Sequence, residues 1–357
     1  METAPQNQIL NKSNASFPVA SPPPQIALMQ MITGYWLSQT IYAAAKLGIA
    51  DHLKTGEHHY TELAKNTEAN PEALYRLLRA LASVGIFAET EPGKFITTPL
   101  AVLLQSDSDG SLRDFSIMMG DKEHYGSWGN IMYAVKTGDS SFKDVFGMDV
   151  FQYYTQNPEP AEIFDRAMTS FSEMEVIGVI ADYDFSGIRT LVDVAGGHGS
   201  LLTSVLKANP NMTGILFDLA NVIERAKSHI VNSEVSDRCQ LISGSFFDYV
   251  PTGADAYILK HIIHDWDDER AIAILKQCHQ AMTHHSKILV VEQVIPPGND
   301  SFMGKMLDVN MLVMCPGGKE RTAEEFAQIF TKAGFKMTRI IPTHAIVSIV
   351  EGIPVPV

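Results

Sequence analysis

The sequence is poor in cysteine, in basic residues and in long apolar runs. Its 357 residues include three cysteines, an odd number at wide spacing, which excludes a disulfide framework and the paired spacing of a zinc site. No apolar stretch is long enough for a membrane span, and no basic segment leads into an apolar one near the N-terminus. With 27 basic and 41 acidic residues the net charge is −14, which disfavours nucleic acid and anionic membranes as partners. We therefore expect a soluble, cytoplasmic protein with neither kind of partner.

The composition and the N-terminal segments predict more than one domain. A chain of this length with 45% hydrophobic and 19% charged residues can hold two globular domains. Residues 1–24 are rich in Asn, Ser and Pro and are expected to form a disordered tail. Residues 26–47 would carry large apolar side chains on nearly every face of a helix. Such a helix needs burial on all sides, which favours a homodimer formed through the N-terminal helices.

The next segments have the order of a winged-helix module. Residues 60–65, 71–84 and 87–98 read as a helix, a second helix and a hairpin. Such a module can bind DNA, but the candidate recognition helix offers only Arg76 and Arg79, on an acidic protein. We therefore expect the module to shape a dimer and a substrate pocket.

The rest of the chain predicts a helical segment followed by alternating strands and helices. Residues 151–180 read as a long helix with Phe164, Met168 and Phe171 at helical spacing. The strand candidates beyond Arg189 are residues 191–194, 214–217, 239–243, 256–259 and 288–292. The expected fold class is α/β, a Rossmann-like domain with a mostly parallel sheet, preceded by a helical, winged-helix dimerisation domain. The expected domains are residues 25–110 for dimerisation, 111–185 as a helical connector that contributes to the substrate pocket, and 186–357 for cofactor binding.

The most informative segment is the glycine-rich turn within residues 191–199. The apolar run 190–194 reads as a buried strand, and residues 200–208 begin a helix whose N-terminal N–H groups face the turn. Asp218 ends the next strand, where a carboxylate can bind the two hydroxyls of a ribose. A dinucleotide site needs a third glycine where Leu202 stands, so the turn fits a cofactor without a pyrophosphate, such as S-adenosylmethionine.

A second group of reactive side chains lies at residues 260–268, directly after another strand. His261 and His264 stand beside aspartates and could form a metal site, but no third ligand cluster supports one. An imidazole can instead act as a general base toward a substrate hydroxyl when a carboxylate orients it. Glu292 and Glu320 are both candidates for that carboxylate. His264 is the favoured base, and the role of His261 stays open.

Three motifs resemble those of the S-adenosylmethionine-dependent O-methyltransferases of the caffeate/hydroxyindole type, a plant-like family with bacterial members that modify aromatic natural products. The motifs are LVDVAGGHG (191–199), HDWDD (264–268) and PGGKERT (316–322). The similarity runs from about residue 26 to the C-terminus and includes the winged-helix dimerisation domain. It implies a homodimeric enzyme without a metal, which binds S-adenosylmethionine and methylates a hydroxyl of a small aromatic substrate.

The resemblance also assigns roles to individual residues. It implies that His264 is the general base, that Asp265 contacts the substrate, and that the two glutamates Glu292 and Glu320 flank the histidine. The implied cofactor contacts are Ser172, Asp193, Gly197, Asp218, Leu219, Ser245, Phe246 and Lys260. The implied substrate contacts are Met118, Met119, His124, Phe164, Met168, Phe171, Asn310, Met311 and Cys315.

The sequence departs from the family pattern at several positions. Ala195 stands where a glycine is usual, and Ser245 stands where many relatives have an aspartate for the adenine amine. The side chains of Phe171, His124 and Cys315 replace pocket residues of the plant phenylpropanoid enzymes, so we do not transfer their substrate. Two alternatives to a phenol O-methyltransferase stay open. One is a relative with another nucleophile or with non-methylating chemistry, and the other is a nicotinamide-dependent oxidoreductase, against which the missing third glycine argues.

Overall fold

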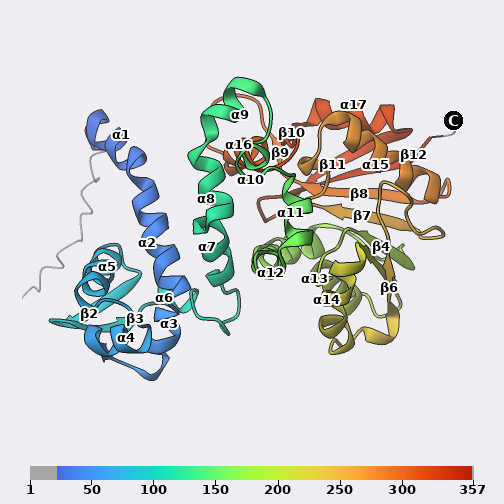
Figure 1. Cartoon of the computed structure of the whole chain (residues 1–357). Coiled ribbons are helices and arrows are strands. Elements are labelled where there is room, and N and C mark those ends of the chain that lie inside the picture. The colour runs from blue at the N-terminus through green and yellow to red at the C-terminus, as the bar shows by residue number, and fades with distance from the viewer. Residues whose placement is uncertain (1–21, 356–357) are drawn as a thin grey trace, which may run out of the picture.

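The computed structural model describes residues 22–355, apart from the side chain of Met174. Residues 1–21 of the expected tail lie outside the described residues. The first helix begins at Pro24, which is the last residue of that expected tail. Figure 1 shows an N-terminal helical unit, a row of helices beside it, and a sheet covered by helices at the opposite side.

Helices build most of the N-terminal unit, and a small antiparallel sheet of order β1-β3-β2 completes it. Its elements are α1 (Pro24–Ile32), α2 (Gly34–Lys46), α3 (Ile49–His52), the 3-10 turn η1 (Leu53–Thr55), β1 (His58–His59), α4 (Tyr60–Asn66), α5 (Pro71–Ser83), β2 (Phe87–Glu91), β3 (Lys94–Thr97) and α6 (Pro99–Val102). Helix α5 begins where the Asn70 side chain accepts a hydrogen bond from the Ala73 N–H, and it buries Leu74, Leu78 and Leu81 at helical spacing. The unit therefore has the helix, helix and hairpin order expected from the sequence.

The helix expected over residues 26–47 is two helices, α1 and α2. Helix α1 ends at Thr33, whose hydroxyl donates to the Met29 carbonyl at 2.9 Å, and Gly34 begins α2. Large apolar side chains stay exposed on both helices, with Met31 77% and Trp36 59% exposed in the single chain. Contiguous apolar side chains of this size are typical of a surface that another protein covers.

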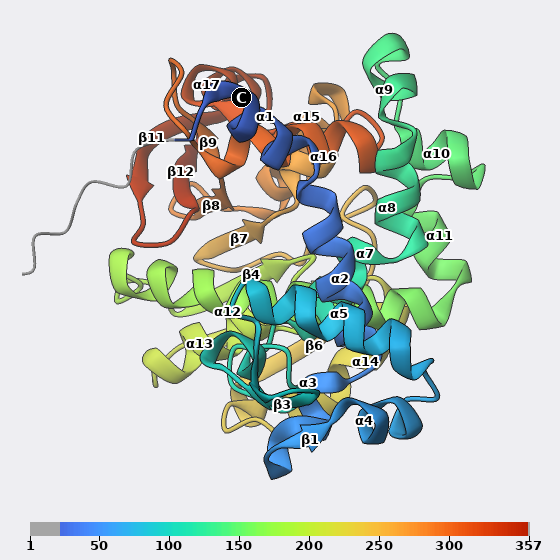
Figure 2. The ribbon, with the colours of Figure 1, turned by 90° about the vertical axis from the view of Figure 1, so that its left-hand side faces the viewer.

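A helical connector joins this unit to the sheet. It consists of α7 (Arg113–Gly120), α8 (Lys122–Gly129), α9 (Ile131–Thr137), α10 (Ser141–Phe146), α11 (Val150–Gln156) and the long α12 (Pro158–Asp182). The helix expected over residues 151–180 is interrupted at Asn157, because Pro158 disfavours a helical backbone at the residue before it. Helix α2 lies beside α7 in Figures 1 and 2, and there the Tyr42 hydroxyl donates to Asp121 at 2.9 Å.

The C-terminal half is built on a seven-stranded sheet of order β11-β12-β8-β7-β4-β5-β6. Its strands are β4 (Thr190–Val194), β5 (Thr213–Asp218), β6 (Cys239–Ser243), β7 (Ala256–Lys260), β8 (Lys287–Glu292), β11 (Phe335–Pro342) and β12 (Ser348–Pro354). Strands β4 to β8 run parallel, while β12 joins β8 in the antiparallel direction and β11 extends that edge. The expected α/β class with a mostly parallel sheet is confirmed, and each expected strand is present. The antiparallel edge formed by β11 and β12 is an addition that the sequence analysis did not contain.

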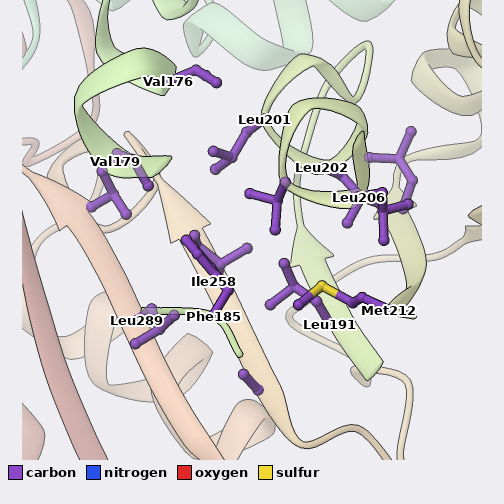
Figure 3. Packing of buried hydrophobic residues seen from close by; sticks show 14 of the residues in the cluster. Val176, Val179, Phe185, Leu191, Leu201, Leu202, Leu206, Met212, Ile258 and Leu289 are labelled. Carbon is purple, nitrogen blue, oxygen red and sulfur yellow. The ribbon is translucent and has the colours of Figure 1, made fainter. Parts of the chain in front are cut away.

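Helices cover both faces of this sheet. The remaining elements are α13 (Ser200–Ala208), α14 (Ala220–Val231), the 3-10 turns η2 (Ser236–Arg238) and η3 (Ile263–Asp265), α15 (Asp268–Ala281), β9 (Val294–Ile295), α16 (Met303–Met314), β10 (Arg321–Thr322) and α17 (Ala323–Lys332). Figure 3 shows one apolar cluster, in which Val179 of α12 and Leu201 of α13 lie over Ile258 of β7. A second cluster packs Ile274 of α15 and Phe330 of α17 on the other face.

The strand order places a topological switch point at the centre of the sheet. Strand β4 has β5 on one side and β7 on the other, so the chain connections diverge from β4. In open parallel sheets ligands bind at such a point, beyond the carboxyl ends of the strands. The segments that follow β4, β5 and β7 are therefore brought to one edge.

Candidate active site

The turn after β4 combines an unusual backbone with open space. Ala195, Gly197 and Gly199 have φ angles of +58°, +59° and +81°, in the left-handed region. A Cβ atom built on Gly197 would meet no atom within 4 Å, whereas one on Gly196 would lie 2.5 Å from the Asp193 carboxyl carbon. Ala195 thus adopts a backbone conformation that glycine adopts more readily. Gly196 is required by packing, while Gly197 leaves room for a ligand.

Two carboxylates lie beside this turn. Asp218, at the end of β5, accepts hydrogen bonds from the Gly197 N–H at 2.9 Å and the Leu219 N–H at 2.7 Å, and burial raises its pKa to about 6. Asp193 on β4 is only 1% exposed, and burial raises its pKa to about 7. Its Oδ2 atom has no hydrogen-bond partner among the described residues. An unpartnered buried oxygen is typical of a site that a ligand completes.

The other cofactor contacts expected near the strand ends follow β5 and β6. Leu219, directly after Asp218, is 43% exposed. Ser245 accepts a hydrogen bond from the Phe247 N–H at 3.2 Å and so belongs to the turn after β6. Phe246 packs edge-on against Trp266, with 6.1 Å between ring centroids. These residues therefore line the same edge as the glycine turn.

A buried polar network joins the end of β7 to α12. The Lys260 ammonium donates to the Ser172 hydroxyl at 2.6 Å and lies 3.4 Å from Glu175 Oε2. His261 Nε2 lies 2.9 Å from both oxygens of Glu175. Burial lowers the pKa of His261, although Glu175 opposes this shift. Glu175 was not among the residues expected at the site, and its signal in the sequence was an acidic residue directly before the apolar run 176–180.

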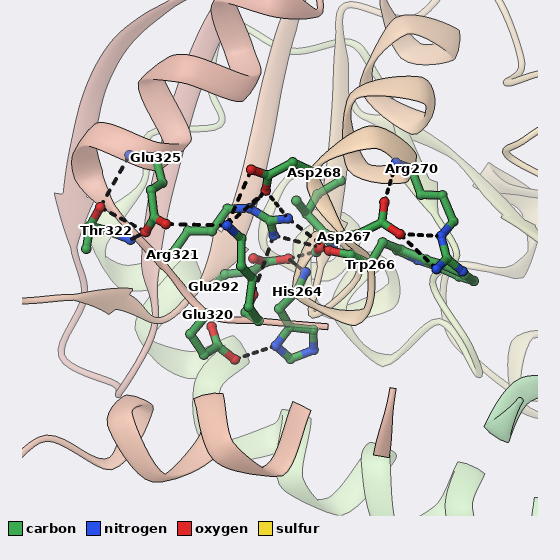
Figure 4. A network of polar contacts seen from close by, with 12 residues as sticks. His264, Trp266, Asp267, Asp268, Arg270, Glu292, Glu320, Arg321, Thr322 and Glu325 are labelled. Atoms are coloured by element: carbon green, nitrogen blue, oxygen red, sulfur yellow. Dashed lines mark hydrogen bonds and ion pairs between the residues drawn. The ribbon is translucent and has the colours of Figure 1, made fainter. Parts of the chain in front are cut away.

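His264 lies on the turn η3, almost completely buried. Its Nδ1 donates to Glu320 Oε1 at 2.6 Å, and its Nε2 lies 3.7 Å from Asp265 Oδ1. Burial alone would lower the pKa of His264, but the carboxylates, Glu320 first, outweigh it and raise the pKa to about 10. Figure 4 shows the imidazole held by Glu320 through one nitrogen, while no drawn contact reaches the other. Nε2 is therefore the nitrogen available to a substrate.

Glu292 holds the backbone of the turn rather than the ring. Its Oε1 accepts from the Ile263 N–H at 2.6 Å and from the His264 N–H at 3.1 Å. Burial raises the pKa of Glu292 to about 7, and its Oε2 has no partner among the described residues. The two glutamates expected beside the histidine thus act on different parts of it, Glu320 on the imidazole and Glu292 on the main chain.

Arg321 fixes the same loop from behind. Its side chain is fully buried and donates to the carbonyl oxygens of Ile263 at 2.9 Å and Trp266 at 2.8 Å. It also forms an ion pair with Asp268 at 2.9 Å, as drawn in Figure 4. Arg321 was not among the expected site residues, although it belongs to the motif at residues 316–322.

Some of the expected substrate contacts gather near His264. Phe164, Met311 and Cys315 belong to one apolar cluster, in which Phe164 stacks on Tyr154 with 4.7 Å between centroids. The Cys315 thiol donates to Asp265 Oδ1 at 3.3 Å. This cluster is therefore in direct contact with the residue that follows the histidine.

The remaining expected substrate contacts lie on the connector helices or face them. Met118 and His124 line a cavity of about 170 Å³, and burial lowers the pKa of His124 to about 4. Met119, next along α7, is 37% exposed. On α12, Met168 is half-buried, and Phe171 stacks on Phe115 with 5.5 Å between centroids. The Asn310 amide oxygen accepts from the Trp128 indole N–H at 2.9 Å, so α16 is tied to α8.

The described residues contain neither a metal-ion cluster nor a helix able to span a membrane. Within residues 22–355, no three His, Cys, Asp or Glu side chains are arranged to hold a metal ion. His261 and His264 instead have separate carboxylate partners, Glu175 and Glu320. Over the same described residues, no helix combines the length and apolar character needed to cross a membrane.

Comparisons with known proteins agree with this architecture. Residues 128–336 match the model of an O-methyltransferase domain, and residues 29–107 match that of an O-methyltransferase dimerisation domain. The chain is 44% identical over 328 residues to phenazine O-methyltransferase PhzM of Lysobacter antibioticus, covering 92% of this chain and 96% of that protein. It is 31% identical over 314 residues to phenazine-1-carboxylate N-methyltransferase of Pseudomonas aeruginosa, covering 88% and 92%.

Solved structures give the same result. The crystal structure of LaPhzM has a TM-score of 0.91 and 43% identity, covering 94% of this chain and all of that one. NcsB1, an O-methyltransferase from neocarzinostatin biosynthesis solved with S-adenosylmethionine and 2-hydroxy-5-methyl naphthoic acid, has a TM-score of 0.79 and 30% identity, covering 89% and 96%. These matches decide between the methyltransferase and the nicotinamide-dependent oxidoreductase that the sequence left open. The chain is an enzyme that belongs to the family of S-adenosylmethionine-dependent O-methyltransferases and carries both the catalytic and the dimerisation domain of that family.

Proposed function

We propose that this enzyme transfers a methyl group to a phenolic hydroxyl of a small aromatic natural product or precursor, with His264 as the general base. The observation that carries the proposal is the 2.6 Å contact between Glu320 and His264 Nδ1, which leaves Nε2 without a hydrogen bond to the described residues. A carboxylate in this position fixes the tautomer and stabilises the imidazolium that forms when Nε2 takes a proton.

The cofactor side of the proposal rests on the edge beyond β4, β5 and β7. S-adenosylmethionine supplies an electrophilic methyl group on a sulfonium centre. The open space at Gly197 and the unpartnered oxygen of Asp193 fit a polar ligand of this kind. Asp218 would bind the ribose hydroxyls, and Lys260 with Ser172 would bind the charged end of the molecule. The proposed contacts around these are Leu219, Ser245 and Phe246.

The proton transfer is well matched in acidity. A free phenol has a pKa near 10, and the carboxylates around His264 raise its pKa to about 10. Transfer of the phenolic proton to Nε2 is therefore close to balanced, and Glu320 at Nδ1 stabilises the positive charge of the imidazolium. The same raised pKa predicts that the rate of methyl transfer rises with increasing pH, because only the neutral imidazole accepts a proton.

The substrate side of the proposal is an apolar, aromatic-lined region beside Asp265. Phe164, Met311 and Cys315 already share one cluster there, and thioether and aromatic side chains adapt to flat rings. Met168, Phe171, Asn310, Met118, Met119 and His124 complete the proposed set. A phenazine or naphthoic-acid scaffold, named for two of the similar proteins, is the kind of flat substrate that such a lining would hold.

Oxygen is the nucleophile that this base favours. A phenol must lose its proton to become a good nucleophile, whereas a neutral aromatic amine already has a lone pair. A buried histidine whose pKa is raised by a carboxylate is therefore useful mainly for a hydroxyl. One relative is an N-methyltransferase, so the nucleophile needs a direct test.

The test uses substrates that differ in one atom. Purified enzyme is incubated with S-adenosylmethionine and with phenazine or naphthalene pairs that carry a hydroxyl or an amino group at the same position. The methylated product is identified by mass and by NMR. We expect methylation of the hydroxyl members. Methylation of the amino members alone, or of no member while the cofactor is bound, would contradict the proposal.

We further propose that the functional unit is a homodimer formed through the exposed faces of α1 and α2. In each subunit, residues 25–110 would form the dimerisation domain, 111–185 the connector and 186–357 the cofactor-binding domain. The exposed apolar side chains of α1 and α2 support this, as does the match of residues 29–107 to a dimerisation domain. Sedimentation should show a dimer, and charged substitutions at Met31 and Trp36 should convert it to a monomer.

A further inference from the structure

Glu175 is a buried charged residue of α12, at the start of the apolar run 176–180. The residue is 1% exposed, and Val176 and Val179, further along the helix, pack over the sheet as Figure 3 shows. A carboxylate at such a depth is costly unless it has partners. Its partners come from the end of β7, where the proposed cofactor site lies.

The contacts of Glu175 tie the cofactor side of the site to the base. Its Oε2 lies 3.4 Å from the Lys260 ammonium, which also holds Ser172 at 2.6 Å. Both of its oxygens lie 2.9 Å from His261 Nε2. The His261 ring in turn lies against that of His264, with 4.9 Å between centroids. Glu175 thus links the Lys260 ammonium to the His261 ring through a carboxylate.

The charges in this network have a defined balance. Burial raises the pKa of Glu175, but His261 and Lys260 outweigh it and hold that pKa below its ordinary value, so the carboxylate is ionised. Burial lowers the pKa of His261, although the Glu175 carboxylate opposes this shift. Burial raises the pKa of Asp193, which interacts with Lys260, to about 7, so Asp193 carries less negative charge at that pH than Glu175, whose pKa is lowered.

We propose that Glu175 makes the site select S-adenosylmethionine over its product S-adenosylhomocysteine. The negative charge of Glu175 offsets the positive charge of the Lys260 ammonium, beside the place where the sulfonium of the cofactor must bind. The proposal rests on the function proposed above. S-adenosylmethionine carries one positive charge more than S-adenosylhomocysteine, and the two molecules are otherwise alike at their polar groups. A buried anion therefore favours the first over the second, which helps release of the product after methyl transfer.

The size of the effect follows from one unit of charge. At a separation of roughly 10 Å and an effective dielectric of about 20, a unit charge changes an affinity by about tenfold. Glu175→Gln removes the charge and keeps the shape of the side chain and one of its two acceptor oxygens. The ratio of the Kd of S-adenosylhomocysteine to the Kd of S-adenosylmethionine should therefore fall about tenfold.

The experiment measures both dissociation constants by isothermal titration for the wild type and three variants. Glu173→Gln is the matched control, because Glu173 is exposed on the same helix, and its ratio should equal that of the wild type. Lys260→Met removes the opposing charge and should raise the ratio, even though both ligands bind more weakly. Opposite changes in Glu175→Gln and Lys260→Met identify a charge effect, since a structural defect weakens both ligands alike.

The outcomes separate this inference from the function on which it rests. Wild-type enzyme that binds neither ligand would overturn the proposed function. Wild-type enzyme that binds both, with an unchanged ratio in Glu175→Gln, would overturn only the charge-selective role of Glu175. If Glu175→Gln does not fold, as judged by its circular dichroism, Lys260→Met decides, and an unchanged ratio in that variant overturns the inference.

Discussion

Replacing Glu320 by glutamine should change both the rate of methyl transfer and its dependence on pH. Glu320 is the largest of the influences that raise the pKa of His264, against a burial that lowers it. Glutamine can still accept the hydrogen bond from Nδ1 at 2.6 Å, so the ring keeps its tautomer and loses only the neighbouring charge. The variant therefore isolates the electrostatic contribution of the carboxylate.

The magnitude follows from the shift in pKa. Without Glu320, burial should bring the pKa of His264 from about 10 to its ordinary value near 6.5 or below. That change corresponds to roughly 5 kcal/mol between the two protonation states, at about 1.4 kcal/mol for each unit. If the proton is about half transferred in the transition state, roughly half of this energy is lost, which lowers the plateau rate, at a pH where His264 is neutral in both enzymes, on the order of 10²-fold.

The direction of the pH effect is also fixed. His264 acts as a base only when neutral, so activity rises as pH increases through its pKa. A lower pKa therefore moves the acid limb of the profile of kcat/KM against pH toward lower pH, while the plateau falls. Glu324→Gln, on an exposed neighbouring glutamate of α17, should leave both unchanged. An acid limb at the same pH in wild type and Glu320→Gln would refute the assignment of Glu320 as the orienting carboxylate.

Three further substitutions have defined outcomes. Gly197→Ala should cost about 1 to 2 kcal/mol of folding free energy because of its positive φ, and should also weaken binding of S-adenosylhomocysteine in a titration, because the added methyl enters open space. Arg321→Met should lower stability to urea by about 3 kcal/mol or more and reduce activity, since Asp268 and two carbonyl groups lose their buried donor. Glu351→Gln should cost about 1 to 2 kcal/mol at pH 7, through lost hydrogen bonds to Tyr183 and Arg339. Because the pKa of Glu351 is lowered to about 2, its contribution exists above its ordinary pKa near 4.3 and disappears as pH falls toward 2, so urea unfolding should show the two proteins converging at low pH.

The central part of the fold could be predicted because its signals are local. An apolar run, three glycines and a helix start specify β4, its turn and α13, and the acid at the end of β5 has a fixed place in such a unit. The break between α11 and α12 could also have been predicted, since Pro158 marks it in the sequence. These features depend on neighbouring residues alone.

The features that escaped prediction depend on distant residues. Strand β11 alternates irregularly between buried and exposed positions and has a register shift between Met337 and Arg339, so its pattern is weak. The sequence indicated that two glutamates lie near His264, but it did not indicate which of them binds the imidazole ring. Only the packing of β8 against η3 directs Glu292 to the main chain. The partner of Glu175 likewise lies 86 positions away at His261.

The role of His264 as general base is tested most directly by methylation of phenols that differ in acidity. In His264→Ala, methyl transfer to a phenol of pKa near 10 should fall about 10²- to 10⁴-fold, while the affinity for S-adenosylhomocysteine is retained. His285→Ala, at an exposed histidine, serves as the control and should match the wild type. For phenols acidic enough to be ionised at the assay pH, the loss in His264→Ala should nearly disappear, because no base is needed. An equal loss for every phenol, or no loss for any, would contradict the account.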